Sequence, residues 1–379
     1  MSDFSTLLDK AASITDPRIN RTKKHNLADM VVIAVYAVIC GADGWEDIEF
    51  IAKARKDFLG KYLSLENGIP HHDTFRRVFS RINEQQLIRA LNEWSQALNE
   101  SLAGKVVAID GKTLRNSFDT ASSKSALHSI TAFVCDSNTV LAQVFGDNKQ
   151  SEITQDVELL KSIDITGAIV TSDAMGCQKR IAEQIVKGNK ADYLLACKDN
   201  QPTLRRLLED MFSSPMPHLS ESDCRDVDKG HGRIETRTCR CLDVSALHNE
   251  EFTAWQKLRT IAKISSVRDT TAGQSSDIRY YISSLPCDAK KILKAVRSHW
   301  RIENSLHWVL DAVFHEDDSR IRRDHGPANF ASLRRTALSL IKNHMSSLNN
   351  PIVKTCRKAR MAAILNANNA DRLFTGLEF

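Results

Sequence analysis

Residues 105–110 read KVVAID, and two further apolar runs follow, SALHSITAFVCDS at residues 125–137 and NTVLAQVFG at residues 138–146. Runs rich in β-branched and apolar side chains are typical of β-strands, and the polar residues 136–138 predict a hairpin turn between the last two. No strand signal precedes them in the first 100 or so residues. These three runs therefore mark the beginning of a sheet.

Helix and strand patterns alternate after this point, which is typical of an α/β sheet with crossover connections. We predict helices at residues 152–163, 177–187 and 202–212, and strands at residues 167–174 and 191–198. The sequence thus indicates an α/β core of three consecutive strands followed by crossover units.

The region before the sheet has the spacing of helices, with apolar periodicity in residues 27–39, 48–58 and 87–98. His72, Asp73 and Thr74 can cap another helix. Its inward side chains would be Phe75, Val78, Phe79 and Ile82, and its outward ones Arg76, Arg77 and Arg81. This helix could face DNA or could be a core helix with a basic solvent face, and periodicity alone does not separate the two.

The alternation of helices and strands stops at residues 214–286. A Ser/Pro-rich stretch there precedes three β-like runs at residues 233–244, 258–267 and 278–285. We interpret this segment as an inserted, mainly β part of the chain. A long amphipathic helix is predicted from Asp288 onward. Its apolar stripe consists of Ile302, Leu306, Val309, Leu310 and Val313.

The 379 residues are 42% hydrophobic and 26% charged, a globular composition long enough for two or three domains. The longest apolar run, residues 30–42, is shorter than the roughly 20 residues of a membrane-spanning helix, so we predict a buried core helix. The start of the chain has no export signal, and we expect a cytoplasmic protein. The nine cysteines form no C-x2-C pair that could begin a zinc site, and we expect them to be reduced.

Positive charge is concentrated near the C-terminus. Residues 320–360 hold ten Lys or Arg and one acid, Asp324, so this segment carries +9 against a net charge of +5 for the whole chain. An excess of this size predicts the main contact with a polyanion such as DNA. The alternative is a solvated helix face.

Three carboxylates lie where strand ends and a helix could converge: Asp110 after VVAI, Asp173 after AIVTS, and Glu303 on the long helix. Burying a carboxylate is costly unless a positive charge neutralises it. Mg²⁺ prefers oxygen ligands, and two such ions can activate an attacking oxygen and stabilise a leaving one at phosphorus. Taken singly, each Asp could instead cap a turn, and Glu303 could face solvent.

His299, Glu303 and His307 follow one another at intervals of four along one helix face. This spacing could bind a transition metal, but it does not match the H-E-x-x-H pattern of zinc proteases. Histidines that are hydrogen-bonded to neighbours, or that touch a phosphate, fit the pattern better.

Several motifs resemble those of the H-repeat-associated transposases, a subgroup of the DDE transposases of bacterial insertion sequences. The resemblance covers nearly the whole chain. The motifs are IPHHDTFRRVF (69–79), AIDGKTLRNS (108–117), IVTSDAMGCQKRIAEQI (169–185), ADYLLACKDNQPTL (191–204), HGRIETR (231–237) and HWRIENSLHWVLDAVFHEDDSRIR (299–322).

This resemblance implies a ribonuclease-H-like core in which Asp110, Asp173 and Glu303 are the catalytic carboxylates and hold two divalent metal ions, Mg²⁺ or Mn²⁺. We expect a helical N-terminal domain at residues 1–100, which is a possible site of DNA binding, and a basic helical C-terminal region at residues 319–379. The core between them would consist of residues 101–213 and 287–318, with a β-rich insertion at residues 214–286.

In the wider superfamily the glutamate belongs to a Tyr, Arg, Glu, Lys signature, which falls here on Val296, His299, Glu303 and Leu310. Val296 and Leu310 cannot bind a phosphate, so other residues must do so. Our candidates for contacts to DNA are Lys112, Lys198, Arg297, His299, Arg301, Arg320, Arg322, Arg323, Arg334 and Arg335. Trp255 could stack on a displaced base, although a core position fits it better.

The function that the resemblance implies is DNA transposition: metal-dependent cleavage at the element's terminal repeats, followed by strand transfer into target DNA. Bringing two ends together makes a homodimer on DNA a reasonable expectation, associated with the nucleoid. Two alternatives stay open at this point, a catalytically inactive DNA-binding remnant of a transposable element and a purely hydrolytic DNA nuclease.

Overall fold

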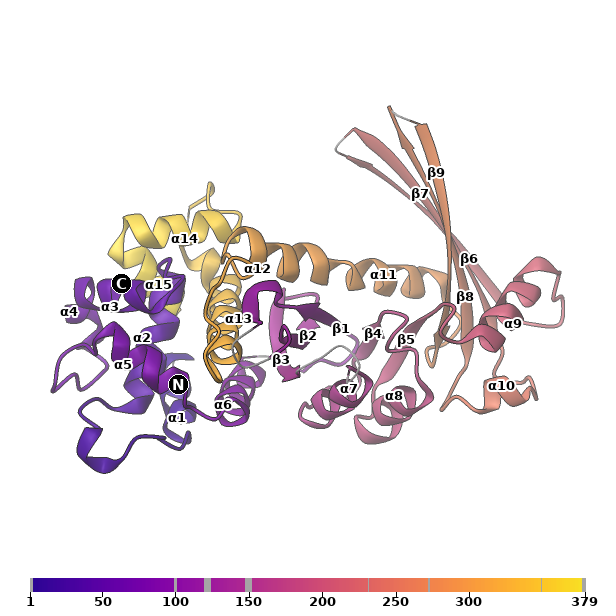
Figure 1. The fold of residues 1–379 in the computed structure, drawn as a ribbon. Helices are drawn as coiled ribbons and strands as arrows, with labels where there is room; N and C mark the ends of the chain where they lie inside the picture. The colour runs from indigo at the N-terminus through magenta and orange to yellow at the C-terminus, as the bar shows by residue number, and fades with distance from the viewer. Residues whose placement is uncertain are drawn as a thin grey trace. The chain divides into compact units, whose positions relative to one another are not determined.

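The computed structural model describes residues 3–98, 101–118, 124–146, 152–230, 232–271, 273–348 and 350–376. Residue 231, the first of the HGRIETR motif, lies outside these ranges. The structure is mixed α/β, with a large sheet and many helices (Figure 1). The chain divides into two compact units, and each is described by itself. The first contains Met1–Glu100, Gly111–Ser151 and Ile302–Phe379, and the second contains Ser101–Asp110 and Glu152–Arg301.

The N-terminal part of the first unit is helical, with no strand among the described residues 3–98. The three predicted helical stretches are present, and the middle one is divided into α3 and α4. The elements are α1 (Asp3–Ala12), the 3-10 turn η1 (Asn20–Thr22), α2 (Leu27–Ile39), α3 (Trp45–Ala54), α4 (Lys56–Leu59), α5 (His72–Phe79) and α6 (Glu84–Ala97).

Helix α2 is the apolar run that the sequence assigns to the core, and this prediction is confirmed. Asn26 caps it by accepting a hydrogen bond from the backbone N–H of Ala28 at 2.7 Å. Every residue of α2 except Asp29 is buried. Across the described part of the chain, no helix combines the length and the apolar character needed to cross a bilayer.

Helix α5 presents the predicted faces, because Phe75, Val78 and Phe79 are buried and the arginines are exposed. Its cap differs from the prediction. The N-cap is His71, whose Nδ1 accepts a hydrogen bond from the backbone N–H of Asp73 at 3.3 Å. An imidazole acceptor can satisfy a free N–H at a helix start as a carboxylate does, but it is not among the usual capping residues.

The rest of the first unit combines two antiparallel strands with C-terminal helices. The predicted hairpin turn is confirmed at residues 135–138, where Asn138 adopts the left-handed conformation (φ 56°). The elements are the end of β1, the 3-10 turn η2 (Arg115–Ser117), β2 (His128–Val134), β3 (Thr139–Gly146), the π-helical turn η5 (Glu303–His307), α12 (Trp308–Ala312), α13 (Gly326–His344), the 3-10 turn η6 (Met345–Leu348), α14 (Cys356–Leu365) and α15 (Ala367–Thr375).

Strand β3 is the last in the strand order, and side chains from two helices satisfy its open edge. Asn92 of α6 donates to the carbonyl of Gln143 at 3.0 Å and accepts from its N–H at 3.1 Å. Ser339 of α13 accepts from the N–H of Val140 at 3.1 Å. The edge is therefore closed to pairing with another strand.

The second unit holds the crossover strands. In strand order they run β1, β4, β5, β9, β8, β7, β6, with β1, β4 and β5 parallel and the later pairs antiparallel. Figure 1 shows β6 to β9 as long neighbouring ribbons. The elements are β1 (Val106–Thr113), α7 (Glu152–Lys161), β4 (Ile169–Ser172), α8 (Lys179–Glu183), the π-helical turn η4 (Gln184–Gly188), β5 (Asp192–Cys197), α9 (Pro202–Ser213), β6 (Glu221–Gly230), β7 (Arg233–Asp243), α10 (Glu250–Thr253), β8 (Thr260–Thr270), β9 (Gly273–Ser283) and α11 (Ala289–His299).

The sequence predicts three strands between residues 214 and 286, and the structure has four. Strand β6 escapes prediction because its sequence, ESDCRDVDKG, is polar and none of its residues is buried. It pairs with β7 along its whole length, from Glu221 opposite Leu242 to Gly230 opposite Arg233. Hydrogen bonds to a neighbouring strand, which local sequence does not encode, make this segment a strand.

The predicted long helix is not regular. It consists of α11 up to His299, the π-helical turn η5 and α12. The predicted apolar stripe of Ile302, Leu306, Val309, Leu310 and Val313 is nevertheless buried. The wider π turn begins at Glu303, and single π turns inside helices are frequent at functional sites.

A buried carboxylate organises the charges of the first unit. Glu316 has no solvent exposure, and its Oε1 lies 2.6 Å from Nη1 of Arg335 on α13. Lys112 reaches the same group, with Nζ 3.4 Å from Glu316, 2.7 Å from Asp311 and 2.9 Å from Asp317. Burial raises the pKa of Glu316, but the charges of Arg335 and Lys112 outweigh this effect and the net pKa is lowered. Glu316 is therefore ionised.

We predict that Glu316→Gln lowers the free energy of unfolding by about 3–5 kcal/mol near neutral pH, because Arg335 would stay buried without its counter-charge. Since the pKa of Glu316 is lowered on folding, the loss should be complete above the unfolded pKa of about 4.3 and should shrink as the pH falls through the folded value. Urea unfolding measures it. Glu158→Gln, at an exposed position of α7, is the matched control, and equal effects of the two variants would refute the role given to the buried pair.

Candidate active site

Asp110 and Asp173 occupy equivalent places on two adjacent strands of the second unit. Strands β1 and β4 are parallel, and their pairing ends with Ile109 opposite Ser172. The residue that follows each of these two positions is an aspartate, so both carboxylates lie at the same edge of the sheet, and both are half-buried. One detail corrects the sequence analysis: Asp110 does not end its strand, because β1 continues to Thr113.

The loop after β4 fixes the carboxylate of Asp173. Its Oδ1 accepts hydrogen bonds from the backbone N–H groups of Met175 at 2.8 Å and Gly176 at 3.4 Å. Oδ2 takes part in neither bond. A side chain at position 176 would come within 2.1 Å of the Ser172 hydroxyl, so the close turn requires glycine. One oxygen of Asp173 thus holds the loop while the other is available.

Two residues that the sequence analysis did not single out support this loop from behind. Asn200 donates from Nδ2 to the carbonyl of Ala174 at 2.5 Å, and Gln201 donates from Nε2 to the carbonyl of Cys177 at 3.0 Å. Both belong to the KDNQ stretch after β5. Their presence in a shared motif is the only signal that sequence offers, because the contact joins segments about 25 residues apart.

His299, at the end of α11, is attached to the same strand. Its Nδ1 lies within hydrogen-bonding distance, 3.1 Å, of Oγ1 of Thr171, two residues before Asp173. The structure therefore gives His299 a positioning contact to the sheet. Cys177, also near Asp173, is fully buried, and its contact with Cys197 and its burial raise its pKa. It remains a thiol packed under the loop.

Glu303 belongs to the first unit, where it opens the π-helical turn η5. Its side chain is 53% exposed, and its Oε2 lies 3.5 Å from Nδ1 of buried His307. The carboxylate is thus accessible to solvent and has a histidine beside it. Glu303 is four residues after His299 in the sequence.

Three of the predicted DNA contacts are engaged inside the first unit. Arg334 and Arg335 are 2% and 1% exposed, and Arg335 is paired with Glu316. Lys112 lies among three carboxylates and its side chain is 11% exposed. Lys112 and Arg335 face the buried carboxylate of Glu316, and Arg334 lies inside the unit, where it donates to the backbone carbonyl of Asp43 at 3.4 Å. Arg360, another cation of the basic C-terminal segment, is also buried.

The other candidates differ in how they are held. Arg322 is half-buried, donating to the carbonyl of Asn116 at 3.1 Å and lying over the ring of Phe118. Arg297 is exposed but paired with Asp226 at 2.5 Å and Asp228 at 2.9 Å. Four remaining candidates are exposed, namely Lys198, Arg301, Arg320 and Arg323.

A basic groove of about 720 Å³ runs between α11 and β6 in the second unit. Its helix wall presents cations at residues 290, 294, 297 and 301, a spacing that places them on one helix face. Cations outnumber acids five to one along the groove. The charged lining residues are Arg225, Asp226, Lys290, Lys294, Arg297 and Arg301.

Trp255 is 2% exposed and donates from its indole nitrogen to Glu251 at 3.3 Å, with Lys179 over its ring. The prediction of a core tryptophan is confirmed. Trp300, three residues before Glu303 in sequence, is an exposed aromatic residue of the second unit. The guanidinium group of Arg279 lies over its ring.

Comparison with known proteins agrees with the resemblance to transposases. Residues 8–95 match the family model described as DDE_Tnp_1-associated, and residues 102–340 match the one described as Transposase DDE domain. The chain is 39% identical to "H repeat-associated putative transposase YhhI" of Escherichia coli (strain K12), over 90% of this chain and 91% of that protein.

Two further relatives bear on function. "Putative transposase YncI" of Escherichia coli O157:H7 is 40% identical over 90% of this chain and 88% of its own length. "Inactive transposase YbfQ" of Escherichia coli (strain K12) is 51% identical over 57 residues, which are 15% of this chain and 68% of that protein. With most of its length matched by the DDE domain and its associated domain, this chain belongs to the DDE transposase family of insertion sequences.

Proposed function

We propose that this protein is an active DNA transposase, which cuts DNA at the ends of its own insertion sequence and joins the freed 3′ ends to target DNA. The observation that carries the proposal is the pair of aspartates in register, Asp110 on β1 and Asp173 after β4. Membership of the DDE transposase family supports it. The catalytic part would be a ribonuclease-H-like core formed by residues 101–213 and 287–318.

The other parts of the chain are assigned accordingly. Residues 1–100 would form a helical N-terminal domain, residues 214–286 a β-rich insertion in the core, and residues 319–379 a helical C-terminal region. Six α-helices without a strand among the described residues 3–98, and four antiparallel strands between Glu221 and Ser283, support the first two assignments. Because two element ends must be brought together, we expect a homodimer on DNA.

The side chains fit a site for divalent metal ions. Asp110, Asp173 and Glu303 supply only carboxylate oxygens, which are the donors that Mg²⁺ and Mn²⁺ prefer. Oδ2 of Asp173 is left out of the loop hydrogen bonds, and Glu303 is half exposed. We assign two ions to these three carboxylates. Bound there, they would polarise the scissile phosphate and lower the pKa of an attacking hydroxyl group.

The surrounding residues act by holding the carboxylates in place. Gly176, Asn200 and Gln201 fix the turn that orients Asp173. Thr171 and His299 join β4 to the last turn of α11, from which the chain continues to Glu303. Preorganised ligands of this kind lower the cost of assembling the reacting groups.

We propose that the groove between α11 and β6 binds DNA. Phosphate groups are bound chiefly by Lys and Arg side chains, and the groove concentrates five of them around a single acid, Asp226. Lys198, Arg301, Arg320 and Arg323 are exposed and extend the set of candidate contacts. Arg334 and Arg335 are omitted because they are buried.

We predict that Asp110→Asn, Asp173→Asn and Glu303→Gln each reduce Mg²⁺-dependent nicking of DNA from the element's borders by about a thousandfold, the effect of losing about 4 kcal/mol of transition-state stabilisation. EDTA should abolish the activity of the unaltered protein. Asp210→Asn, an exposed aspartate on α9, is the control.

Normal cleavage by the Asp110→Asn protein would overturn the assignment of the site. Specific binding of border DNA without any metal-dependent cleavage by the unaltered protein would indicate an inactive remnant. Cleavage without transfer of pre-nicked ends to a target plasmid would indicate a purely hydrolytic nuclease.

For the groove, we predict that Lys290→Gln combined with Lys294→Gln weakens DNA binding and lowers the slope of log affinity against log salt by about 2, since each phosphate contact contributes about 0.9. Lys56→Gln with Lys161→Gln, two exposed lysines on other helices, should leave the slope unchanged. Fluorescence anisotropy at several salt concentrations measures both. Equal slopes for the two double variants would place the DNA elsewhere.

A further inference from the structure

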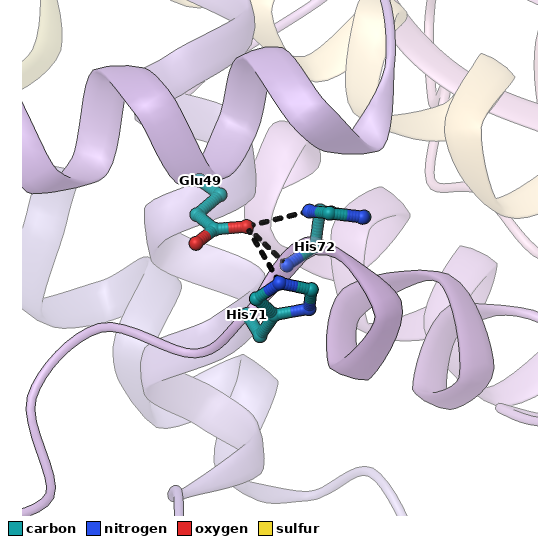
Figure 2. Close-up of side chains that lie close together, drawn as sticks. All are labelled: Glu49, His71 and His72. Atoms are coloured by element: carbon teal, nitrogen blue, oxygen red, sulfur yellow. Dashed lines mark hydrogen bonds and ion pairs between the residues drawn. The ribbon is translucent and has the colours of Figure 1, made fainter.

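A second group of metal-ligating side chains lies among the N-terminal helices, in residues that the proposed function does not use. Figure 2 shows Glu49 of α3 directed toward His71 and His72 at the start of α5. Oε2 of Glu49 is 2.7 Å from Nδ1 of His72 and 3.9 Å from Nε2 of His71. One ligand atom from each residue lies within 4.8 Å of the others.

The carboxylate is held in place by hydrogen bonds before any ligand arrives. Glu49 is buried, and its Oε2 accepts a hydrogen bond from the backbone N–H of His72 at 2.6 Å. Its Oε1 accepts a hydrogen bond from Lys53 Nζ at 2.6 Å. These hydrogen bonds hold the carboxylate so that Oε2 points at the two imidazoles.

The distances suit a small tetrahedral ion. Zinc bonds of about 2.0 Å to nitrogen and oxygen place neighbouring ligand atoms about 3.3 Å apart. The observed separations from Oε2, 2.7 and 3.9 Å, lie on either side of that value. The imidazoles of His71 and His72 are also partly exposed, at 58% and 33% of their side-chain area, so an ion can reach them from solvent.

We infer that Glu49, His71 and His72 form a binding site for a late transition-metal ion, with Zn²⁺ the ion that best fits two imidazoles and one carboxylate. Such a set differs in kind from the all-oxygen site proposed for catalysis, because imidazole nitrogen favours zinc over magnesium. The inference does not rest on the proposed function. It would leave at least one position on the metal for water.

Asp73 is the residue that adapts His71 to this role. Nδ1 of His71 accepts the N–H of Asp73, which places the ring proton on Nε2. Binding through Nε2 requires the proton to move to Nδ1, which then gives up the hydrogen bond from the Asp73 N–H and can donate instead toward the carboxylate of Asp73, with Oδ2 3.8 Å away. A histidine that binds metal through one nitrogen and donates to a carboxylate from the other is the usual arrangement at zinc sites.

The site would join the middle of α3 to the first turn of α5. Helix α5 carries the exposed cations Arg76 and Arg77, and the exposed Arg81 follows two residues after the helix ends. A bound ion would therefore fix the direction of a basic helix that the sequence analysis left as either a DNA-facing or a solvent-facing element.

The test is a competition titration of the full-length, metal-free protein with Zn²⁺ and a chromophoric chelator. We expect His71→Ala and His72→Ala to weaken the site by about tenfold or more, and Asp73→Asn to weaken it by about 10–100-fold, the usual effect of losing a carboxylate partner of a bound histidine. His218→Ala, an exposed histidine in the second unit, is the matched control. Asp110→Asn should keep full zinc affinity, which separates this site from catalysis.

Because the chain has nine cysteines, the ligand type is checked with Co²⁺. The site predicts d–d absorption without sulfur-to-cobalt charge transfer. Zn²⁺ should also raise the Tm of the unaltered protein and of His218→Ala but not of His72→Ala, whose metal-free Tm shows whether it is folded. Unchanged zinc affinity in His71→Ala and His72→Ala, or a cobalt spectrum with thiolate bands alone, would overturn the inference and leave a plain hydrogen-bonded pair.

Discussion

The first unit depends on the neutralisation of Glu316. A carboxylate without solvent exposure is tolerated only when cations surround it, and here Arg335 comes from α13 and Lys112 from the end of β1. The same lysine also holds Asp311 and Asp317. Lys112 is two residues from Asp110, and the acids follow Glu303 along the chain. This charge cluster therefore anchors, within the first unit, the segments next to two of the proposed catalytic residues.

A consequence is that positive charge in the sequence and positive surface in the structure are different things. The segment 320–360 is strongly basic, but Arg334, Arg335 and Arg360 are buried among acids, aromatic rings and backbone carbonyls. The other seven cations of that segment are not buried, and a further set lines the groove beside α11, where helical spacing aligns Lys290, Lys294 and Arg297. Net charge along a sequence says little about which cations remain free to meet a phosphate.

The chemistry proposed for this protein rests on a simple property of parallel strands, since their carboxyl ends meet at one edge of the sheet. Residues after Ile109 and Ser172 must lie side by side once β1 and β4 pair, and both are aspartates. A small set of backbone and side-chain contacts then fixes the loop: Asp173 to Met175, and Asn200 to Ala174. The N-terminal cluster of Glu49, His71 and His72 is built differently, from a helix and a helix start, and its donors are mostly nitrogen.

The sequence by itself determined the family, the succession of helices and strands around Asp110 and Asp173, the buried helix α2 and the apolar stripe beyond Glu303. These follow from local periodicity, strand composition and long motifs. Tertiary structure alone decided that β6 is a strand, that His71 caps α5, that Lys112 and Arg335 serve a buried acid, and that Glu49 meets two histidines. Each of these depends on strand pairing, on burial or on a specific side-chain contact, and neither periodicity nor composition records which group a side chain will meet.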